Sequence, residues 1–200
     1  MNLIDRAGIK RYHELHVQEH GEGTVRALGW RHSEDQLARF AMLAQIGDMN
    51  DHSVLDIGCG HGDLRGYLGN LYPRLSYAGI DQIDSFLEIA TNRYGHLPET
   101  KFYLGDCYTA ELPQADYVLV CGSLNYHSGE TDFIYKMISK LFNTCQVALG
   151  FNLLSKVDAP GGILVTYDPD AILQHCSTLT DKVVFQDDYF EGDFMVWMYR

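Results

Sequence analysis

Residues 54–62 read VLDIGCGHG, a short apolar run that stops at a cluster of glycines. The apolar run is typical of a buried strand, and the glycines directly after it let the backbone approach a ligand where a Cβ atom would collide. A helical pattern resumes at Leu64 and continues to Leu71, before Pro73. The sequence therefore predicts a strand, a glycine-rich turn and a helix, with something bound closely at the turn.

The same alternation of strands and helices continues along the chain. The strand that holds the apolar run spans 53–57, and further strands are expected at 76–80, 101–104, 117–120 and 146–153. Further helices are expected at 85–94 and 132–141. Because strands separated by helices form mostly parallel sheets, the predicted fold class is α/β. A helix at 170–176 precedes two strands, 182–186 and 194–199, which we expect to close the sheet as an antiparallel hairpin.

The N-terminal part of the chain has a different pattern. Apolar residues recur at helical spacing between Ile9 and about Gln45, and Gly21, Gly23 and Gly29 interrupt them. This pattern predicts two helices around a glycine-containing turn.

The chain is expected to form one domain. Its 200 residues, 46% of them hydrophobic, suit a single full core. We therefore predict one domain over 1–200, with a helical cap or lid over 1–50 and an α/β core over 51–200. The stretch DAPGG at 158–162 is interpreted as a loop within this domain.

The composition excludes several partners. A net charge of −12 opposes binding to a phosphate backbone or an anionic membrane, and no stretch approaches the ~20 apolar residues that a membrane span requires. The most basic stretch of the sequence holds Arg26, Arg31, His32 and Arg39, but acidic residues interrupt it. This stretch indicates a solvated helix surface or, at most, a pocket for an anionic group. No nucleic acid and no membrane is expected as a partner.

The cysteines indicate the compartment. Five cysteines lie far apart and never form a CxxC pair, so the sequence predicts neither a disulfide framework nor a zinc site. A cytoplasmic localisation fits this pattern best.

Three carboxylates accompany the predicted strand ends. Asp56 precedes the glycines, where it suits a ligand ammonium group but repels a pyrophosphate. Asp81 ends the next strand, where a carboxylate can accept hydrogen bonds from two ribose hydroxyls. Asp106, between Gly105 and Cys107, can accept a hydrogen bond from an adenine amino group. Together they favour a cofactor that has both nucleoside and amino-acid parts.

These motifs resemble those of the class I S-adenosylmethionine-dependent methyltransferases, over roughly residues 54–154. The matching features are the glycine turn, Asp81, the Gly-Asp pair at 105–106 and the segment CGSLN at 121–125. The resemblance implies a Rossmann-like methyltransferase fold, which has a seven-stranded, mostly parallel sheet, an antiparallel C-terminal hairpin and, here, an N-terminal helical lid. It also implies S-adenosyl-L-methionine as cofactor and S-adenosyl-L-homocysteine as product. The implied cofactor-binding residues are Asp56, Gly58, Cys59, Gly60, Asp81, Gln82, Gly105, Asp106, Cys107 and Cys121.

Two other interpretations of the glycine turn remain open. An NAD-binding turn of the GxGxxG type is the main alternative, but Asp63 stands where that motif needs its third glycine. Alternatively, the carboxylates only cap helices and the glycines only turn the chain.

The acceptor side carries fewer signals. Methyl transfer is an in-line displacement that needs no covalent enzyme nucleophile, but a hydroxyl or protonated amine acceptor benefits from a general base. His127, just past the fourth core strand, is the predicted catalytic base, and an exposed loop histidine is the alternative. Candidate acceptor-pocket residues are Tyr12, His13, Trp30, Gln36, Asn125 and Tyr126.

His13, His16 and His20 lie at helical spacing and superficially suggest a metal site. No further ligand is fixed beside them, so we expect a lid over the active site and no metal.

The sequence favours transfer to a small-molecule acceptor, an O, N or C nucleophile, because no added recognition domain is visible. A protein or RNA methyltransferase, or a non-catalytic protein of the same fold that binds the cofactor, stays an alternative.

Overall fold

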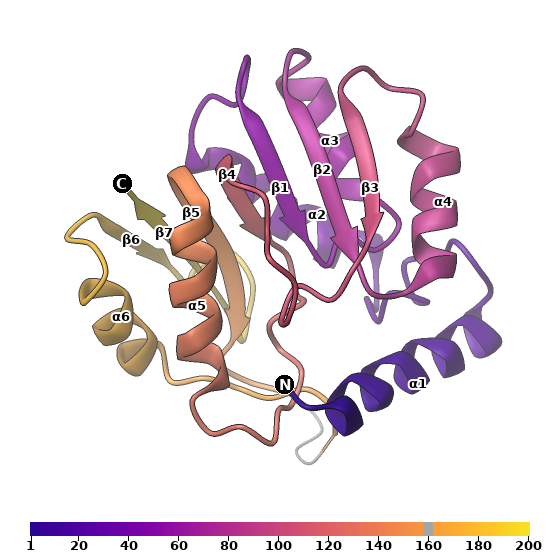
Figure 1. Cartoon of the computed structure of the whole chain (residues 1–200). Coiled ribbons are helices and arrows are strands. Elements are labelled where there is room, and N and C mark those ends of the chain that lie inside the picture. Colours follow the sequence, from indigo (N-terminus) through magenta and orange to yellow (C-terminus); the bar gives the residue numbers. More distant parts are fainter. Residues whose placement is uncertain (158–161) are drawn as a thin grey trace.

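The computed structural model describes residues 1–157 and 162–200. All but the last residue of the predicted loop at 158–162 lies outside the described residues. The chain forms a seven-stranded sheet in the order β3-β2-β1-β4-β5-β7-β6, with helices on both sides (Figure 1). The strands are β1 (Ser53–Ile57), β2 (Ser76–Asp81), β3 (Thr100–Leu104), β4 (Ala115–Val120), β5 (Cys145–Leu154), β6 (Val183–Gln186) and β7 (Asp193–Tyr199).

The sheet is parallel from β3 to β5, and β7 is antiparallel to both β5 and β6. The predicted fold class and the antiparallel C-terminal hairpin are therefore confirmed. The hairpin adds to the sheet through its second strand, β7, which is longer and more deeply buried than β6. Residues 193–198 are buried, whereas β6 is partly exposed and forms the edge.

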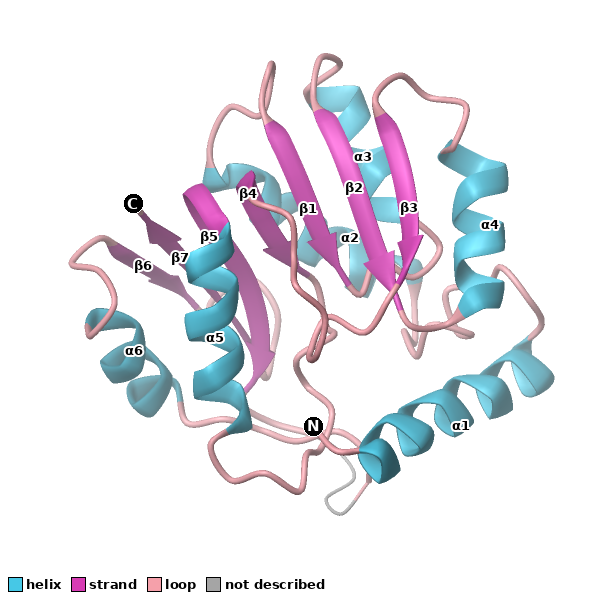
Figure 2. Cartoon of the chain, viewed as in Figure 1, coloured by secondary structure: helices cyan, strands magenta, loops and turns pink. Residues whose placement is uncertain are grey.

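The helices cover the sheet in two layers (Figure 2). They are α1 (Leu3–His20), α2 (Ser33–Leu43), the short 3-10 helix η1 (Ala44–Ile46), α3 (Asp63–Leu71), α4 (Asp84–Tyr94), α5 (Phe133–Thr144) and α6 (Pro169–Ser177). One hydrophobic core lies between the sheet and α5 with α6, and a second lies between the sheet and α2, η1 and α3. This arrangement buries both faces of the central strands, which explains why those strands are apolar runs without alternation.

Helix α1 begins earlier than its apolar pattern indicated. The Asn2 side chain accepts hydrogen bonds from the N–H groups of Ile4 and Asp5, and the Asp5 carboxylate accepts one from the N–H of Asn2. This capping box starts the helix at Leu3 rather than at Ile9. Figure 1 shows α1 lying across the ends at which the parallel strands finish, apart from both helical layers.

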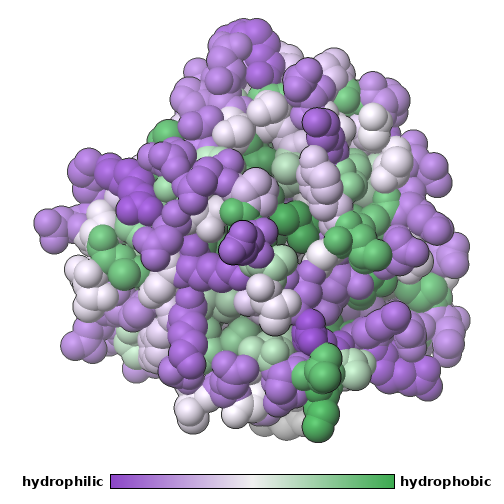
Figure 3. Space-filling model, viewed as in Figure 1, coloured by the Kyte–Doolittle hydropathy of each residue, from purple (hydrophilic) through white to green (hydrophobic). Residues whose placement is uncertain are grey.

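The surface matches a chain of this charge. Hydrophilic residues cover most of the face seen in Figure 3, and the apolar residues visible there form small groups. Among the described residues, no helix is long and apolar enough to cross a membrane.

Candidate cofactor and acceptor site

A cavity lies at the carboxyl ends of the central strands, between them and α1. It is lined by all ten predicted cofactor residues and by all six predicted acceptor-pocket residues, which are given above by number. In an open α/β sheet, ligands bind outside the carboxyl ends of the strands, where the strand order changes direction. Here that point is between β1 and β4, which are neighbours in the sheet although two strands separate them in sequence.

The glycine turn is held close to its neighbours. Gly58 has a φ of +73°, and a Cβ atom there would lie 2.4 Å from the Cβ of Ser123, in the loop after β4. The N–H groups of Gly58 and Cys59 both donate to the carbonyl of Ile80, at 2.8 and 3.1 Å. The glycines therefore serve first to bring the turns after β1, β2 and β4 together, and the cavity opens where these turns meet.

Two of the three predicted carboxylates, Asp56 and Asp81, lie on adjacent strands at the floor of the cavity. The Asp81 side chain accepts hydrogen bonds from the N–H groups of Gly60 at 2.9 Å and Ile83 at 3.0 Å. Burial raises the pKa of Asp81, and these N–H donors oppose the shift because they stabilise the carboxylate. Its position at the end of β2 and this fixed orientation suit hydrogen bonding to a diol.

Asp56 is more deeply enclosed. The Tyr77 hydroxyl donates to its carboxylate at 2.5 Å, and only 2% of the residue is exposed. Burial raises the pKa of Asp56 to about 7, although the hydroxyl opposes the shift. A cationic group placed beside Asp56 would lower this pKa again, so the site favours binding of an ammonium.

The loop after β3 forms the opposite wall. Asp106 accepts hydrogen bonds from the N–H of Tyr108 and the hydroxyl of Thr109, and it forms an ion pair with Arg6 of α1. The predicted adenine acceptor is thus already tied to the helix that covers the cavity. The Lys140 ammonium of α5 donates to three carbonyls of residues 107–110, at 2.7 to 3.1 Å, and holds this loop in place.

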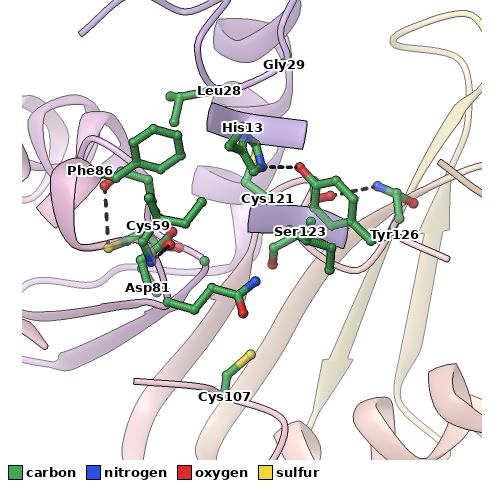
Figure 4. A pocket seen from close by; sticks show the side chains of 18 of the residues that line it. His13, Leu28, Gly29, Cys59, Asp81, Phe86, Cys107, Cys121, Ser123 and Tyr126 are labelled. Atoms are coloured by element: carbon green, nitrogen blue, oxygen red, sulfur yellow. Dashed lines mark hydrogen bonds between the residues drawn. The ribbon is translucent and has the colours of Figure 1, made fainter. Parts of the chain in front are cut away.

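The cysteines on the cavity wall are not nucleophiles. The sulfur of Cys107 points toward the cavity from the side opposite His13 (Figure 4). Burial raises the pKa of Cys107 to about 12 and also raises the pKa of Cys121, so both are neutral thiols. They act as small apolar surface against which a ligand can pack.

A histidine and a tyrosine face each other on the acceptor side. His13 Nε2 lies 2.8 Å from the Tyr126 hydroxyl, and His13 Nδ1 lies 3.1 Å from the carbonyl oxygen of Ala27 (Figure 4). A carbonyl only accepts hydrogen bonds, so Nδ1 carries the proton, and Nε2 accepts from the tyrosine. Burial lowers the pKa of His13 to about 4, which leaves the imidazole neutral near pH 7.

His127, the predicted catalytic base, is placed elsewhere. Its side chain is exposed, it does not line the cavity, and its backbone N–H donates to the carbonyl of Ile163. The bridge between Tyr126 and Leu164 turns Tyr126 inward, and because neighbouring residues of an extended segment point to opposite sides, His127 faces outward. Of these two histidines, His13 lines the cavity and His127 does not.

The sequence missed a buried ion pair at one end of the cavity. Arg39 of α2 donates from Nε to Asp193 at 2.8 Å, and its Nη2 lies 2.6 Å from the same carboxylate. The Asn152 amide also donates to Asp193, and the guanidinium lies over the rings of Trp30 and Phe190. Arg39 appeared in the sequence only as part of an interrupted basic cluster, and nothing local marked Asp193, which lies 154 positions away.

The three histidines of α1 do not converge. The His13 side chain turns into the cavity. The ring of His16 instead packs on the ring of Tyr12, with 4.2 Å between their centroids, and its centroid lies 5.5 Å from that of the His20 ring. Over residues 1–157 and 162–200, no group of three or more His, Cys, Asp or Glu side chains is placed to hold a metal ion.

Comparison with known proteins supports the interpretation of the motifs. A family model described as a methyltransferase domain matches residues 54–146, which hold the glycine turn, all three predicted ligand carboxylates and the loop after β4. The match covers just under half of the chain and supports its resemblance to the class I S-adenosylmethionine-dependent methyltransferases. The matched residues include those that form the floor and one wall of the cavity.

The matches with curated relatives cover only about half of the length of those relatives. A trans-aconitate 2-methyltransferase of Variovorax paradoxus is 28% identical over 145 residues, which are 70% of this chain and 48% of the relative. A second, from an Acidovorax species, is 22% identical over 77% of this chain and 52% of its own length. The chain therefore spans about half the length of the curated relatives it matches.

Solved structures share the fold over nearly the whole chain. Magnesium protoporphyrin IX methyltransferase from Synechocystis, crystallised with S-adenosylhomocysteine, has a TM-score of 0.74 at 17% identity and covers 98% of both chains. The N-methyltransferase NodS of Bradyrhizobium japonicum, in complex with the same product, has a TM-score of 0.71 at 13% identity, over 96% of this chain and 98% of its own. At these identities the likeness shows the fold.

Proposed function

We propose that the protein transfers a methyl group from S-adenosylmethionine to a small-molecule acceptor. The observation that carries this proposal is the convergence of the glycine turn, Asp56, Asp81 and the loop after β3 on one cavity. These groups fit the cofactor part by part, with Asp56 for the ammonium, Asp81 for the ribose and the loop at 105–107 for the adenine. When bound, the cofactor supplies an electrophilic methyl group on a sulfonium.

The residues of the chain would mainly position the reactants and exclude water. Helix α1 covers the strand ends, and Tyr12, Trp30 and Tyr126 give the acceptor side an aromatic wall. In-line displacement depends on alignment of the nucleophile with the methyl carbon, and a mostly apolar cavity covered by α1 favours it. An acceptor of small size fits such a site, and the curated relatives are named for trans-aconitate.

His13 is the proposed proton acceptor for a hydroxyl or amine substrate. Its Nδ1–H is held by the Ala27 carbonyl, so Nε2 presents a lone pair toward the cavity and the Tyr126 hydroxyl. An acceptor group that replaces or hydrogen-bonds to this hydroxyl can pass its proton to Nε2. The low pKa of His13 makes it a weak base. A weak base is sufficient here, because the proton on the acceptor atom becomes very acidic once that atom has gained the methyl group.

Calorimetric titration with S-adenosylmethionine, S-adenosylhomocysteine and NAD tests the cofactor assignment without knowledge of the acceptor. Binding of both adenosyl ligands with no binding of NAD is the expected result. Binding of NAD alone would overturn the proposal. The formation of S-adenosylhomocysteine in the presence of candidate small acids, phenols and amines then identifies the acceptor.

A further inference from the structure

A lysine that does not line the cavity holds the loop after β3, which forms one of the cavity walls. The Lys140 ammonium of α5 donates to the carbonyls of Cys107, Tyr108 and Ala110, at 2.8, 3.1 and 2.7 Å. An ammonium has three N–H donors, so all of them are used on this one stretch of backbone. Lys140 is partly buried, and none of its ion pairs within the described residues is with a carboxylate.

The stretch that Lys140 holds is a single turn of backbone. At its start, the Asp106 carboxylate accepts the N–H of Tyr108 at 3.0 Å and the hydroxyl of Thr109 at 2.8 Å. The Asp106 carbonyl accepts the N–H of Ala110 at 2.9 Å, which closes the turn. No helix continues from it, so its last carbonyls need other partners, and a cation is favourable there. The turn therefore has a carboxylate at its start and the Lys140 ammonium at its end.

These two charges decide how the peptide groups of the turn are oriented. In a trans peptide, the C=O and the N–H point to opposite sides. Lys140 draws the Cys107 carbonyl toward α5, and the N–H of the same peptide, which belongs to Tyr108, points the other way, to the Asp106 carboxylate. The Asp106 carbonyl bonds to Ala110 inside the turn, so the Cys107 N–H points out of it. That N–H donates to no other residue in the described part of the chain.

The Asp106 carboxylate keeps one acceptor position for a ligand. A carboxylate has about four lone-pair positions. Arg6 and Thr109 donate to Oδ2 of Asp106, and Tyr108 donates to Oδ1, so the remaining position is on Oδ1. Asp106 and Cys107 both line the cavity. An acceptor next to a free N–H matches the 6-amino group of adenine and the ring nitrogen beside it.

We propose that Lys140 is a positioning residue for the cofactor, which acts through the turn at 106–110 and makes the site selective for the 6-amino group of adenine. This inference rests on the proposed function, because it concerns the cofactor of that same site. Without the ammonium, the carbonyls of the turn lose their common partner, and Asp106 and the Cys107 N–H lose their fixed relative orientation. Since Lys140 does not line the cavity, its effect passes through the turn and falls on the adenine end of the cofactor.

Two ligands separate this positioning role from a general loss of stability. They are S-adenosylhomocysteine and its analogue whose purine lacks the 6-amino group. By titration calorimetry, the unmodified protein should bind S-adenosylhomocysteine about tenfold more tightly than the analogue, because one hydrogen bond to a carboxylate is lost. Lys140→Met should reduce this preference to less than about threefold, while its affinity for the analogue changes by less than about threefold.

Lys136→Met is the matched control. It removes the same charge from the same helix, but Lys136 is exposed and pairs with Asp132 at 3.0 Å, so this variant should keep the tenfold preference. Lys140→Arg, which keeps a cation with several N–H donors, should retain more of the preference than Lys140→Met. If Lys140→Met does not fold, Lys140→Gln replaces it, and its preference should also be lower than that of the unmodified protein.

The failures of the two proposals are distinguishable. If S-adenosylhomocysteine does not bind to the unmodified protein, the proposed function fails and this inference fails with it. If it binds, the inference alone fails in any of three cases. These are equal binding of the two ligands by the unmodified protein, an unchanged preference or an equal weakening of both ligands in Lys140→Met, and the same loss of preference in Lys136→Met.

Discussion

The two sides of the cavity are constructed differently. On the cofactor side, Asp56, the glycine turn and Asp81 follow consecutive strands of the sheet, and each group is fixed by a neighbour from the next strand or turn. On the acceptor side, His13 meets Tyr126 across 113 positions and Arg39 meets Asp193 across 154. The cofactor side is therefore largely a product of local sequence, whereas the acceptor side depends on how distant segments pack.

The ion pair on the acceptor side provides the largest expected effect. Arg39→Met should lower the free energy of unfolding by about 3–5 kcal/mol, because it leaves the Asp193 carboxylate buried without its cationic partner. Chemical denaturation measures the loss. The double variant Arg39→Met, Asp193→Leu should recover much of it, since both charges are gone. A single variant as stable as the unmodified protein would contradict the dependence of this side on long-range packing.

The cofactor side is tested at its ribose carboxylate. Asp81→Ala should weaken S-adenosylhomocysteine binding by about 1.5–3 kcal/mol, as expected for lost hydrogen bonds to a charged acceptor in a buried site. Titration calorimetry gives the affinity. Glu88→Ala, an exposed carboxylate of the adjoining helix α4, is the control and should bind as before. Unchanged affinity in a folded Asp81→Ala protein would remove the ribose assignment.

The buried histidine predicts a pH dependence. The folded pKa of His13 is about 4 and its ordinary value is 6.5, so between these values the unfolded chain binds a proton that the folded chain does not. Stability therefore falls as the pH falls through this window. His13→Gln should remove on the order of 2 kcal/mol of the loss between pH 6.5 and 4.5. Denaturation at several pH values measures it.

His127→Gln is the matched control for that experiment, since it replaces an exposed histidine of the loop beside Tyr126. Its acid-side loss of stability should equal that of the unmodified protein. If His127→Gln rather than His13→Gln removed the loss, the positions of the two histidines would be the reverse of those described.

The smallest effect is expected where the two sides meet. Arg6 of α1 pairs with Asp106 in the loop after β3, and both side chains are partly exposed. Arg6→Gln should cost less than about 1 kcal/mol of global stability, because such pairs contribute little in contact with water. It should nevertheless increase hydrogen exchange in α1, whose first turn is held to the core by this pair. Unchanged exchange would show that the pair does not fasten the helix.

The class of fold and the residues that line the cavity at the strand ends followed from the sequence alone. Apolar runs, glycines and carboxylates lie within a few positions of one another at each strand end, and parallel strands bring those ends to one edge of the sheet. The positions of these residues at the strand ends therefore predict that they lie close together, even when the packing of the helices is unknown. The residues named for the acceptor pocket also line the cavity, because the lid and the loop after β4 that carry them both lie at those strand ends.

The tertiary structure decided what the sequence could not. His127 faces away from the cavity because the bridge at Tyr126 turns the neighbouring tyrosine inward, and the sequence contains no signal for that bridge. The partnership of Arg39 with Asp193 likewise arises from segments that meet only after folding. A short-range pattern can specify strands and turns, but the partners of buried charges such as these are set by packing between distant segments.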